Sequence, residues 1–264
     1  MVNAVITGST KGIGYALSRE LVRRGHSVVV SGRTQAAVDE AVAGLAPEAT
    51  NGARAVGQVV DVTDAASVQA LWDAAASALG SIDLWVNNAG VAYTMRSIVD
   101  TTPVEVQTMV STNMLGTING SQVAVRGMTA AGGGKLFNVL GGGSDGAIRE
   151  GMGVYSTTKR GLDMFTRALV KEVDGTGVTV GQIRPGILIT DGWLREAATT
   201  PESVSSQRKI LNILSDHVET VAPYLVERML ASSKNGAEIS WLTTGRMMKK
   251  FMGKKEDKLA RYGL

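Results

Sequence analysis

The residues whose types and spacing most clearly suggest chemistry are Tyr155 and Lys159, which follow a glycine-rich run at 141–146. The apolar segment 135–140 before that run predicts a buried strand, and apolar residues after Tyr155 recur at helical spacing. Side chains four residues apart lie on one face of a helix, so we expect the phenol and the ammonium group to be neighbours. A free tyrosine has a pKa of about 10 and needs an electrostatic partner to exchange protons near neutral pH. The pair is a candidate proton donor, although the same spacing also arises by chance on surface helices.

Alternating strand and helix patterns supply the elements that would position this pair. Runs of Val, Ile and Leu without alternation are typical of strands buried on both faces of a parallel sheet, and they occur at 2–6, 27–31, 53–60, 82–86, 135–140 and 178–183. Helical patterns fall between them, at 14–24, 35–45, 65–79, 103–130 and 155–173. This regular alternation predicts an α/β fold, a doubly wound parallel sheet flanked by helices in a single domain.

The turn after the first predicted strand has glycines at 8, 12 and 14 and opens the first predicted helix. Glycine lets the backbone approach a pyrophosphate closely, and the amides of a helix N-terminus attract its negative charge. The spacing G-x-x-x-G-x-G differs from the G-x-G-x-x-G fingerprint and from the phosphate loop that ends in Gly-Lys-Ser/Thr. A nucleotide site is favoured over a simple tight turn, and its candidate cofactor-binding residues are Gly8, Ser9, Thr10, Lys11, Gly12 and Ile13.

The end of the second predicted strand indicates which dinucleotide binds. A dinucleotide fold places an acidic residue about 20 residues beyond the glycines to hold the ribose hydroxyls, but this chain has Gly32 and Arg33 there. A guanidinium group offers a planar set of donors suited to phosphate, and Lys11 is expected nearby. The pattern favours NADP(H) over NAD(H), unless Arg33 is only a solvated loop residue. Asp61 and Val62, at the end of the third predicted strand, could line the adenine pocket.

Three later segments carry small or polar residues near predicted strand ends. Asn88, Ala89 and Gly90 close the fourth strand, at the edge where open α/β folds bind ligands, although the run could also be an ordinary turn. Asn113 interrupts an apolar helical pattern and needs hydrogen bonds if buried, either in a water-linked polar chain or at a local helix bend. After the sixth strand, a threonine hydroxyl and backbone amides could hold a nicotinamide carboxamide, and the residues concerned are Pro185, Gly186, Ile187, Leu188 and Thr190.

The composition bounds the class of protein. The 264 residues are 44% hydrophobic and 19% charged, as in a globular protein with a sizeable core. A net charge of +3 without a long basic block argues against nucleic acid as a partner. No cysteine and only two histidines, His26 and His217, argue against a metal centre. Because residues 1–6 lead directly into a strand pattern and no run could span a membrane, we expect a cytoplasmic location.

Taken together, the motifs resemble the short-chain dehydrogenase/reductase family over residues 2–243. The resemblance rests on T-G-x-x-x-G-I-G at 7–14, Asp61-Val62, N-N-A-G at 87–90, Asn113, Y-x-x-x-K at 155–159 and P-G-x-x-x-T at 185–190. It implies a Rossmann-like sheet of about seven strands that binds NAD(P)(H) for hydride transfer to or from a carbonyl or alcohol carbon. It also implies that Tyr155 is the general acid/base, that Lys159 holds the nicotinamide ribose and lowers the tyrosine pKa, and that Asn113 positions a relay water. Such proteins commonly assemble, so we expect a homodimer or homotetramer.

One position departs from the family pattern. The family usually has a catalytic serine at the end of the fifth strand, but glycines occupy 141–143 and Ser144 is the nearest hydroxyl. Ser144 is therefore a further candidate catalytic residue, with a backbone amide or water as alternatives for holding the carbonyl oxygen. The pattern at 137–146 and 155–160 resembles the chlorophyll(ide) b reductase branch, which also has glycines here and reduces a formyl group with NADPH. We carry over the reaction type and not the pigment.

The segments after the sixth strand are expected to form a substrate-binding region and a tail. Residues 191–214 would close over the carbonyl as a loop and helix, where Trp193, Leu194 and Ile210 could contact substrate or belong to the core. The catalytic domain would then end at 243. The tail 244–264 predicts a basic amphipathic helix, which more commonly packs on its own domain or on a partner subunit than on a membrane surface. Its apolar face would comprise Met247, Met248, Phe251 and Met252.

The sequence therefore predicts an enzyme, an NADPH-dependent oxidoreductase that reduces an aldehyde or ketone to an alcohol, with Tyr155 as proton donor. Its partners would be a small carbonyl or alcohol substrate and further copies of the same chain. The alternative is a catalytically impaired NADP(H)-binding sensor or scaffold on the same fold, recruited to a membrane through its tail.

Overall fold

The structure is a computed structural model that describes residues 1–199, 201–253 and 257–262. Over these ranges the chain forms a parallel seven-stranded sheet in the order β3-β2-β1-β4-β5-β6-β9. The chain winds outward in both directions from the neighbours β1 and β4, so the predicted doubly wound α/β fold is confirmed. The strands are β1 (Asn3–Ile6), β2 (Ser27–Gly32), β3 (Ala55–Val59), β4 (Leu84–Asn87), β5 (Gly134–Val139), β6 (Val178–Arg184) and β9 (Ala237–Ser240).

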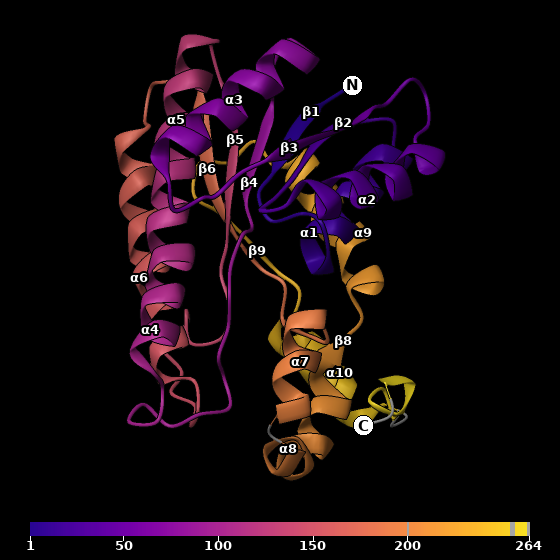
Figure 1. Cartoon of the computed structure of the whole chain (residues 1–264), viewed down its shortest axis with the longest axis vertical. Coiled ribbons are helices and arrows are strands. Elements are labelled where there is room, and N and C mark those ends of the chain that lie inside the picture. The colour runs from indigo at the N-terminus through magenta and orange to yellow at the C-terminus, as the bar shows by residue number, and fades with distance from the viewer. Residues whose placement is uncertain (200, 254–256, 263–264) are drawn as a thin grey trace.

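Helices cover both faces of this sheet (Figure 1). On one face lie α1 (Gly12–Arg23), α2 (Gln35–Leu45) and α9 (Val218–Ala231), and on the other lie α3 (Ala65–Leu79), α5 (Gly116–Ala130) and α6 (Gly153–Glu172). Each face of the sheet packs against its helices in a separate hydrophobic core, and successive strand residues point into opposite cores. Ala4 and Ile6 belong to the core on the α1 side, and Val5 belongs to the core on the α3 side. Burial on both faces explains why the strands read as continuous apolar runs.

The predicted helix at 103–130 is divided in the structure. It consists of α4 (Pro103–Met109), a π-helical segment at Val110–Leu115, and α5. Thr102 and Glu105 begin α4 with a capping box, in which each side chain bonds the other residue's backbone amide. The π-helical segment contains Asn113, and such segments are frequent at functional sites because they redirect one side chain.

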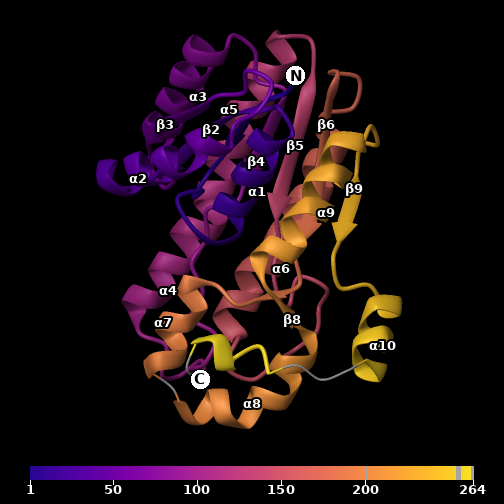
Figure 2. The ribbon, with the colours of Figure 1, turned by 90° about the vertical axis from the view of Figure 1, so that its right-hand side faces the viewer.

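Residues beyond the carboxyl ends of the strands form a separate helical layer (Figures 1 and 2). It contains α7 (Asp191–Thr199) and α8 (Pro201–Leu214), with β7 (Ile187–Leu188) paired in parallel to β8 (Ser215–Asp216). Trp193 and Leu194 pack against a small buried cluster around Ile189, whereas Ile210 is exposed. The expected loop and helix are therefore two helices, and residue 200 of that segment lies outside the described residues. Short 3-10 turns occupy Ala46–Glu48 and Ala260–Tyr262.

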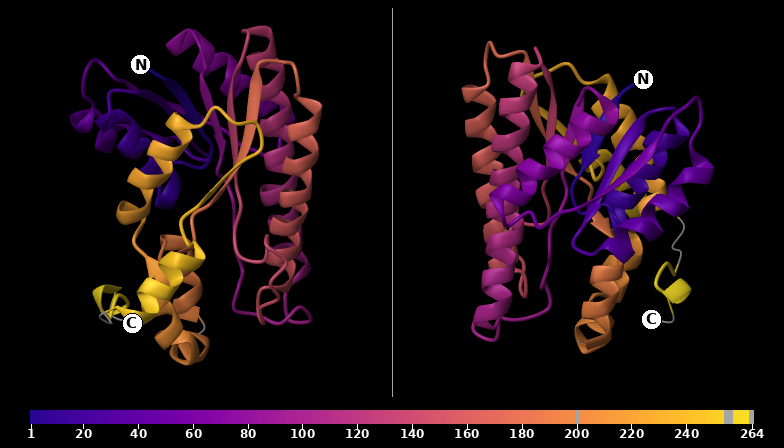
Figure 3. Two further views of the ribbon diagram at one scale, coloured as in Figure 1. Left: turned by 180° about the vertical axis from the view of Figure 1, so that it is seen from behind. Right: turned by 45° about the horizontal axis from the view of Figure 1, so that its top comes forward.

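The tail helix α10 (Thr244–Met252) docks by its basic side (Figure 3). The Arg246 guanidinium lies 3.9 Å from the ring centroid of Trp241, and Lys250 Nζ lies 2.6 Å from Asp216 Oδ1. Met248, Phe251 and Met252 are instead more than half exposed. Three of the four residues on the predicted apolar face are therefore exposed and not packed on the domain, and packing of this face on a partner subunit stays a prediction. Of the tail, 254–256 and 263–264 lie outside the described residues.

No helix in the described ranges combines the length and apolar character needed to cross a lipid bilayer.

Candidate active site

The glycine-rich turn at 7–14 is shaped by hydrogen bonds with the end of β4. Thr7 Oγ1 accepts from the backbone amides of Asn88 and Ala89, each at 3.0 Å. Asn88 Nδ2 donates to the carbonyl oxygens of Thr7 at 2.9 Å and Gly8 at 3.0 Å. A Cβ on Gly8 would lie 2.7 Å from Ala89 Cα, and its φ is +62°, so only glycine fits here. The two predicted motifs thus build one surface.

Ser9 fastens this turn to the neighbouring strand. Its side chain is fully buried, and Oγ donates to the Ile6 carbonyl at 2.6 Å and accepts from the Ser31 amide at 2.9 Å. Its own amide donates to the Ser31 carbonyl at 2.9 Å. Ser9 therefore supports the turn from beneath, while Ile13, at the start of α1, is half-buried above the core.

Lys11 and Arg33 place two cations on the same side of the turn. The Thr10 methyl would lie 2.6 Å from a Cβ on Gly32, so the residues that precede Lys11 and Arg33 are in contact. Both long side chains are exposed. Neither forms a hydrogen bond or an ion pair with any described residue, which leaves two free cations at the β1–β2 edge of the site.

Asp61 and Val62 follow β3 beside these cations. The Asp61 carboxylate accepts from the Thr63 amide at 2.9 Å and from the Thr63 hydroxyl at 2.8 Å. These hydrogen bonds, and to a smaller degree the charge of Arg33, hold the pKa of the Asp61 carboxyl below its usual value. Val62 is buried, and its carbonyl accepts from Asn119 Nδ2 at 2.9 Å.

The segment 185–190 faces the glycine turn from the opposite side. A Cβ on Gly12 would lie 3.9 Å from Thr190 Cβ, so the two segments approach across a narrow gap. Thr190 Oγ1 accepts from the Trp193 amide at 3.3 Å, which places Thr190 at the start of α7. Gly186 has a φ of +83° and turns the chain past Leu242. The remaining predicted residues are the buried Pro185 and the β7 residues Ile187 and Leu188.

The Tyr155 hydroxyl lies directly against the glycine loop that follows β5. A Cβ on Gly141 would lie 2.1 Å from Tyr155 Oη and 3.3 Å from Lys159 Cγ. Lys159 is buried, and its Nζ donates to the Val139 carbonyl at 3.0 Å and lies 5.8 Å from the Tyr155 ring centroid. The Tyr155 hydroxyl forms no hydrogen bond with a described residue. It is therefore a free donor beside a buried cation.

Burial sets the protonation of this pair. Loss of solvation raises the pKa of the Tyr155 hydroxyl to about 12 and lowers the pKa of the Lys159 ammonium to about 8. At neutral pH the tyrosine therefore keeps its proton and the lysine keeps its charge. This is the state needed to donate a proton to a carbonyl oxygen. The direction of the tyrosine shift is opposite to the lowering that the family resemblance implied, because desolvation is the dominant effect on the Tyr155 pKa.

The lysine pKa gives a testable pH dependence. We expect kcat/KM for carbonyl reduction to be level at neutral pH and to fall above pH about 8, as Lys159 loses its charge. Lys159→Met should remove this limb while lowering the whole profile. Between pH about 8 and pH about 10 the buried lysine would be neutral. A native kcat/KM profile that stays level over this range would contradict the role of Lys159.

Asn113 is buried and fully hydrogen-bonded. Its Oδ1 accepts from the Val91 amide at 2.8 Å, and its Nδ2 donates to the Val91 carbonyl at 2.9 Å and to Thr158 Oγ1 at 3.1 Å. A Cβ on Gly90 would lie 3.3 Å from Asn113 Oδ1 and 3.7 Å from Lys159 Nζ. The π-helical segment thus turns Asn113 onto the loop after β4 and brings that loop to the catalytic candidates.

A chain of buried side chains beneath the site was not evident from the sequence. Asn87 and Asn138 are paired in the register of β4 and β5, and Asn87 Nδ2 donates to Asn138 Oδ1 at 2.9 Å. Asn138 Nδ2 continues to Thr166 Oγ1 on α6 at 2.9 Å, and Asn87 Nδ2 also reaches Ser121 on α5 at 3.0 Å. These contacts tie two strands to the helices that carry the site. The only sequence signal for this chain of hydrogen bonds was that Asn87 and Asn138 each lie near the end of a predicted strand.

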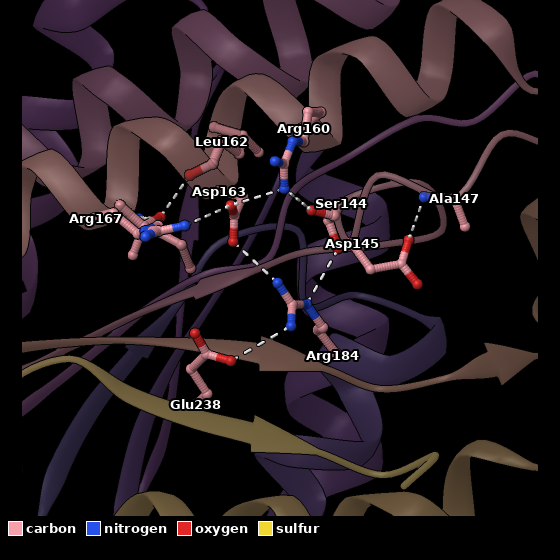
Figure 4. A network of polar contacts seen from close by, with 11 residues as sticks. Ser144, Asp145, Ala147, Arg160, Leu162, Asp163, Arg167, Arg184 and Glu238 are labelled. Carbon is pink, nitrogen blue, oxygen red and sulfur yellow. Dashed lines mark hydrogen bonds and ion pairs between the residues drawn. The ribbon is translucent and has the colours of Figure 1, made fainter. Parts of the chain in front are cut away.

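Ser144 lies beneath the glycine loop. Its side chain is buried, its Oγ accepts from Arg184 Nε at 3.2 Å, and its carbonyl accepts from Arg160 Nη1 at 2.9 Å (Figure 4). The hydroxyl is thus engaged with Arg184, which sequence reasoning did not include in the site. Arg184 in turn reaches Asp163 on α6.

Glu196 joins helix α7 to the loop that follows β4. Its carboxylate, on α7, accepts from the backbone amides of Thr94 and Met95 and from the Thr94 hydroxyl, the last two at 2.8 Å. The loop after β4 and helix α7 are therefore held together next to the catalytic candidates. Sequence reasoning placed α7 over the carbonyl but did not identify this contact.

A dinucleotide suits the surface assembled here. Gly8 and Gly12 leave the backbone open at the carboxyl end of β1, where the strand order reverses and such folds bind nucleotides. Lys11 and Arg33 would face one end of the cofactor, and Lys159 the other. These features define a Rossmann-type, dinucleotide-binding protein.

The family follows from comparison with known proteins. A family model described as short chain dehydrogenase matches residues 2–200. The chain belongs to the short-chain dehydrogenase/reductase family.

Chlorophyll(ide) b reductases are among its curated relatives, so the predicted resemblance is confirmed. A probable chlorophyll(ide) b reductase of Arabidopsis thaliana, NYC1, is 34% identical over 93% of this chain, which spans 51% of that protein's length. A second Arabidopsis chlorophyll(ide) b reductase, NOL, is 36% identical over 89% of this chain and 67% of its own length. The chain thus spans only about half the length of NYC1.

Solved structures share the fold with both kinds of cofactor. L-sorbose reductase from Gluconobacter frateurii, in complex with NADPH, has a TM-score of 0.79 at 25% identity, with coverage of 94% of this chain and 97% of that one. A 3-ketoacyl-(acyl-carrier-protein) reductase from Brucella melitensis, in complex with NADH, has a TM-score of 0.78 at 21% identity, with coverage of 91% and 96%. The fold is therefore compatible with either dinucleotide.

The predicted cytoplasmic location is contradicted by these relatives. The chlorophyll(ide) b reductases of Arabidopsis and rice that match this chain are chloroplastic proteins. The prediction rested on composition and on the first six residues. A folded catalytic domain keeps the same core and site in either compartment, so its sequence carries no signal that separates them.

Proposed function

We propose that this protein reduces an aldehyde or ketone to an alcohol with NADPH, with Tyr155 as the proton donor. The observation that carries the proposal is the unpaired Tyr155 hydroxyl, which lies on Gly141 next to the buried Lys159. When bound, NADPH supplies a hydride to the carbonyl carbon. The carbonyl oxygen takes the Tyr155 proton, which solvent then replaces.

Lys159 and Asn113 both support this step. The Lys159 charge stabilises negative charge that develops on the Tyr155 oxygen as the proton leaves. Asn113 fixes the loop at Val91 through two hydrogen bonds, and a third bond holds Thr158 on the same helix turn as the catalytic pair. Both residues therefore keep the donor oriented before substrate binds.

The preference for NADPH over NADH rests on Lys11 and Arg33. The 2′-phosphate is the group that distinguishes the two cofactors, and hydrogen bonds to charged groups contribute about 1.5–3 kcal/mol each. Replacing Arg33 with Asp should therefore raise KM for NADPH about ten- to hundredfold and improve the use of NADH. The measurement is kcat/KM with both cofactors at fixed substrate.

The matched control for this change is Arg126→Asp. Arg126 is exposed on α5, away from the glycine turn, so the same change in charge there should leave the cofactor preference unaltered. A native protein that prefers NADH would contradict the assignment, as would an equal effect of both substitutions.

The substrate is best sought among carbonyl compounds named by the relatives. The relatives named chlorophyll(ide) b reductase suggest a formyl group as the substrate carbonyl. A relative from Pseudomonas aeruginosa, a 3-oxoacyl-[acyl-carrier-protein] reductase that is 35% identical over 71% of this chain, suggests a ketone. A panel of chlorophyllide b, a 3-oxoacyl thioester and simple aromatic aldehydes separates these classes. We propose the aldehyde class because chlorophyll(ide) b reductases are 34% and 36% identical to this chain over 93% and 89% of its length.

A catalytically impaired sensor is the second candidate, favoured by the glycines that replace a serine at 141–143. It predicts NADPH binding without NADPH oxidation across the whole panel. The free Tyr155 hydroxyl beside Lys159 supports the enzyme instead, since a sensor needs no proton donor.

We further propose a homo-oligomer. Val104 on α4 and Met164 on α6 are each about two-thirds exposed or more, and apolar residues gathered on one side often mark a subunit contact. Light scattering on the purified chain distinguishes a dimer or tetramer from a monomer.

A further inference from the structure

The loop after β5 offers backbone amides where a side-chain hydroxyl would be expected. A side chain on Gly141 would displace the Tyr155 hydroxyl, and Gly143 has a φ of +84° with Ser156 Oγ only 2.3 Å from where its Cβ would be. These two positions therefore require glycine. The amides of Gly141, Gly142 and Gly143 have no hydrogen-bond partner among the described residues, although Ser144 closes the turn by donating to the Gly141 carbonyl at 3.2 Å.

The Ser144 hydroxyl is engaged by Arg184. Arg184, at the end of β6, points toward α6 between Ser144 and Asp163 (Figure 4). Its Nε donates to Ser144 Oγ at 3.2 Å and its Nη2 to Asp163 Oδ1 at 2.9 Å. Arg160 completes the arrangement, since one of its nitrogens reaches both the Ser144 carbonyl at 2.9 Å and Asp163 Oδ2 at 3.2 Å. Both polar groups of Ser144 are therefore fixed from below.

Asp163 anchors this cluster from the helix that carries Tyr155. Its side chain is only 5% exposed, while that of Arg184 is 27% exposed. A buried carboxylate is costly unless it is paired and hydrogen-bonded, and here two arginines approach it within 3.2 Å. The position of the glycine loop is thus tied to α6, so the loop and Tyr155 are positioned by one element.

We propose that Asp163, Arg184 and Ser144 are positioning residues that hold the glycine loop against Tyr155, so that the amides of Gly142 and Gly143 bind the carbonyl oxygen in place of a serine hydroxyl. This inference rests on the proposed reductase function. The amides would stabilise the negative charge that grows on the oxygen as the hydride arrives, before the Tyr155 proton is transferred. Donors fixed in advance are effective because they need not reorganise during the reaction.

The test is Arg184→Met, with and without Gly142→Ser. Arg184→Met should lower kcat about ten- to hundredfold with little change in KM for NADPH, because the loop amides lose their fixed position. Gly142 can accept a side chain if Met152 shifts, since its Cβ would lie 2.7 Å from the terminal methyl group of Met152 and 3.9 Å from Arg149 Nη1. Adding Gly142→Ser should restore kcat about tenfold or more by supplying a hydroxyl that does not depend on the amides. Gly142→Ala in the same background should not.

The controls separate positioning from stability. Arg167→Met removes an exposed arginine that lies 4.0 Å from Asp163 and should leave kcat unchanged. The change Gly142→Ser cannot rebuild the ion pair, so recovery of kcat at an unaltered melting temperature reports the oxygen contact alone. If Arg184→Met does not fold, Ser144→Ala, which removes one hydroxyl group, replaces it in the same design.

Distinct results would overturn the inference. If Ser144 itself held the carbonyl oxygen, its release in Arg184→Met would preserve or raise kcat. Failure of Gly142→Ser to rescue, or rescue by Gly142→Ala to the same extent, would also contradict the amide contact. In each of these cases the native protein still reduces its carbonyl substrate, so the proposed function survives. A native protein without reductase activity would overturn both.

Discussion

Replacing Tyr155 with Phe is expected to lower kcat for carbonyl reduction about a hundred- to ten-thousandfold, the usual contribution of a general acid. The substitution removes only the hydroxyl, which lies on Gly141 and forms no hydrogen bond with the described residues. The fold and the cofactor turn at 7–14 should therefore be unaffected. NADPH affinity, measured by fluorescence titration, should stay close to that of the native protein.

Tyr15→Phe is the matched control. The Tyr15 hydroxyl lies on α1 against Gly44, where a Cβ would be 2.6 Å away. Loss of this hydroxyl should leave kcat unchanged. Full turnover by the Tyr155→Phe protein would remove Tyr155 from the reaction, and equal losses in both variants would indicate a general effect of the substitution.

Replacing Gly141 with Ala is expected to lower kcat about a hundredfold, because displacement of a reacting group by 1 Å can have that effect. An added Cβ would lie 2.1 Å from Tyr155 Oη and 2.9 Å from Cζ, so the ring must move. Cofactor binding at the other end of the site should persist. The measurement is kcat with NADPH affinity determined in parallel.

Gly245→Ala is the matched control. No atom would lie within 4 Å of its Cβ, so we expect less than about a threefold change in kcat, which corresponds to about 0.6 kcal/mol. A Gly141→Ala protein as active as Gly245→Ala would show that the close contact between loop and tyrosine is not needed for turnover.

Much of the fold was predictable because strands buried on both faces leave an unmistakable apolar pattern. β2 and α2 begin at the residues expected, Ser27 and Gln35. The helix predicted at 103–130 was wrong in one respect, since a π-helical segment interrupts it. A polar Asn113 in an apolar pattern indicated that the helix could be interrupted. The sequence did not decide between a local helix bend and a water-linked polar chain, because the partner of Asn113 is Val91, 22 positions earlier.

The site was predictable where motifs carry it and not where distant residues meet. Tyr155, Lys159 and the glycine turn stand out by type and spacing. Arg184 and Asp163 do not, because their meeting with Ser144 depends on how β6, α6 and the loop pack. Sequence spacing contains no record of such contacts.

The tail shows a further limit of pattern reasoning. Amphipathic spacing identified the two faces of α10 but left open whether the apolar one packs on the domain or on a partner subunit. The domain instead offers Asp216 and the rings of Tyr224 and Trp241, which attract the cations Lys250 and Arg246. Which face of a helix packs depends on the surface it meets.

The most direct test of the account follows the hydride itself. The native protein is incubated with NADPH deuterated at the transferred position and with the carbonyl panel, and the products are analysed by mass spectrometry. We expect an alcohol that gains one deuterium on the former carbonyl carbon, and no such product from the Tyr155→Phe protein. NADPH that binds but is never oxidised, or oxidation without a deuterated alcohol, would contradict the assignment of this protein as a carbonyl reductase.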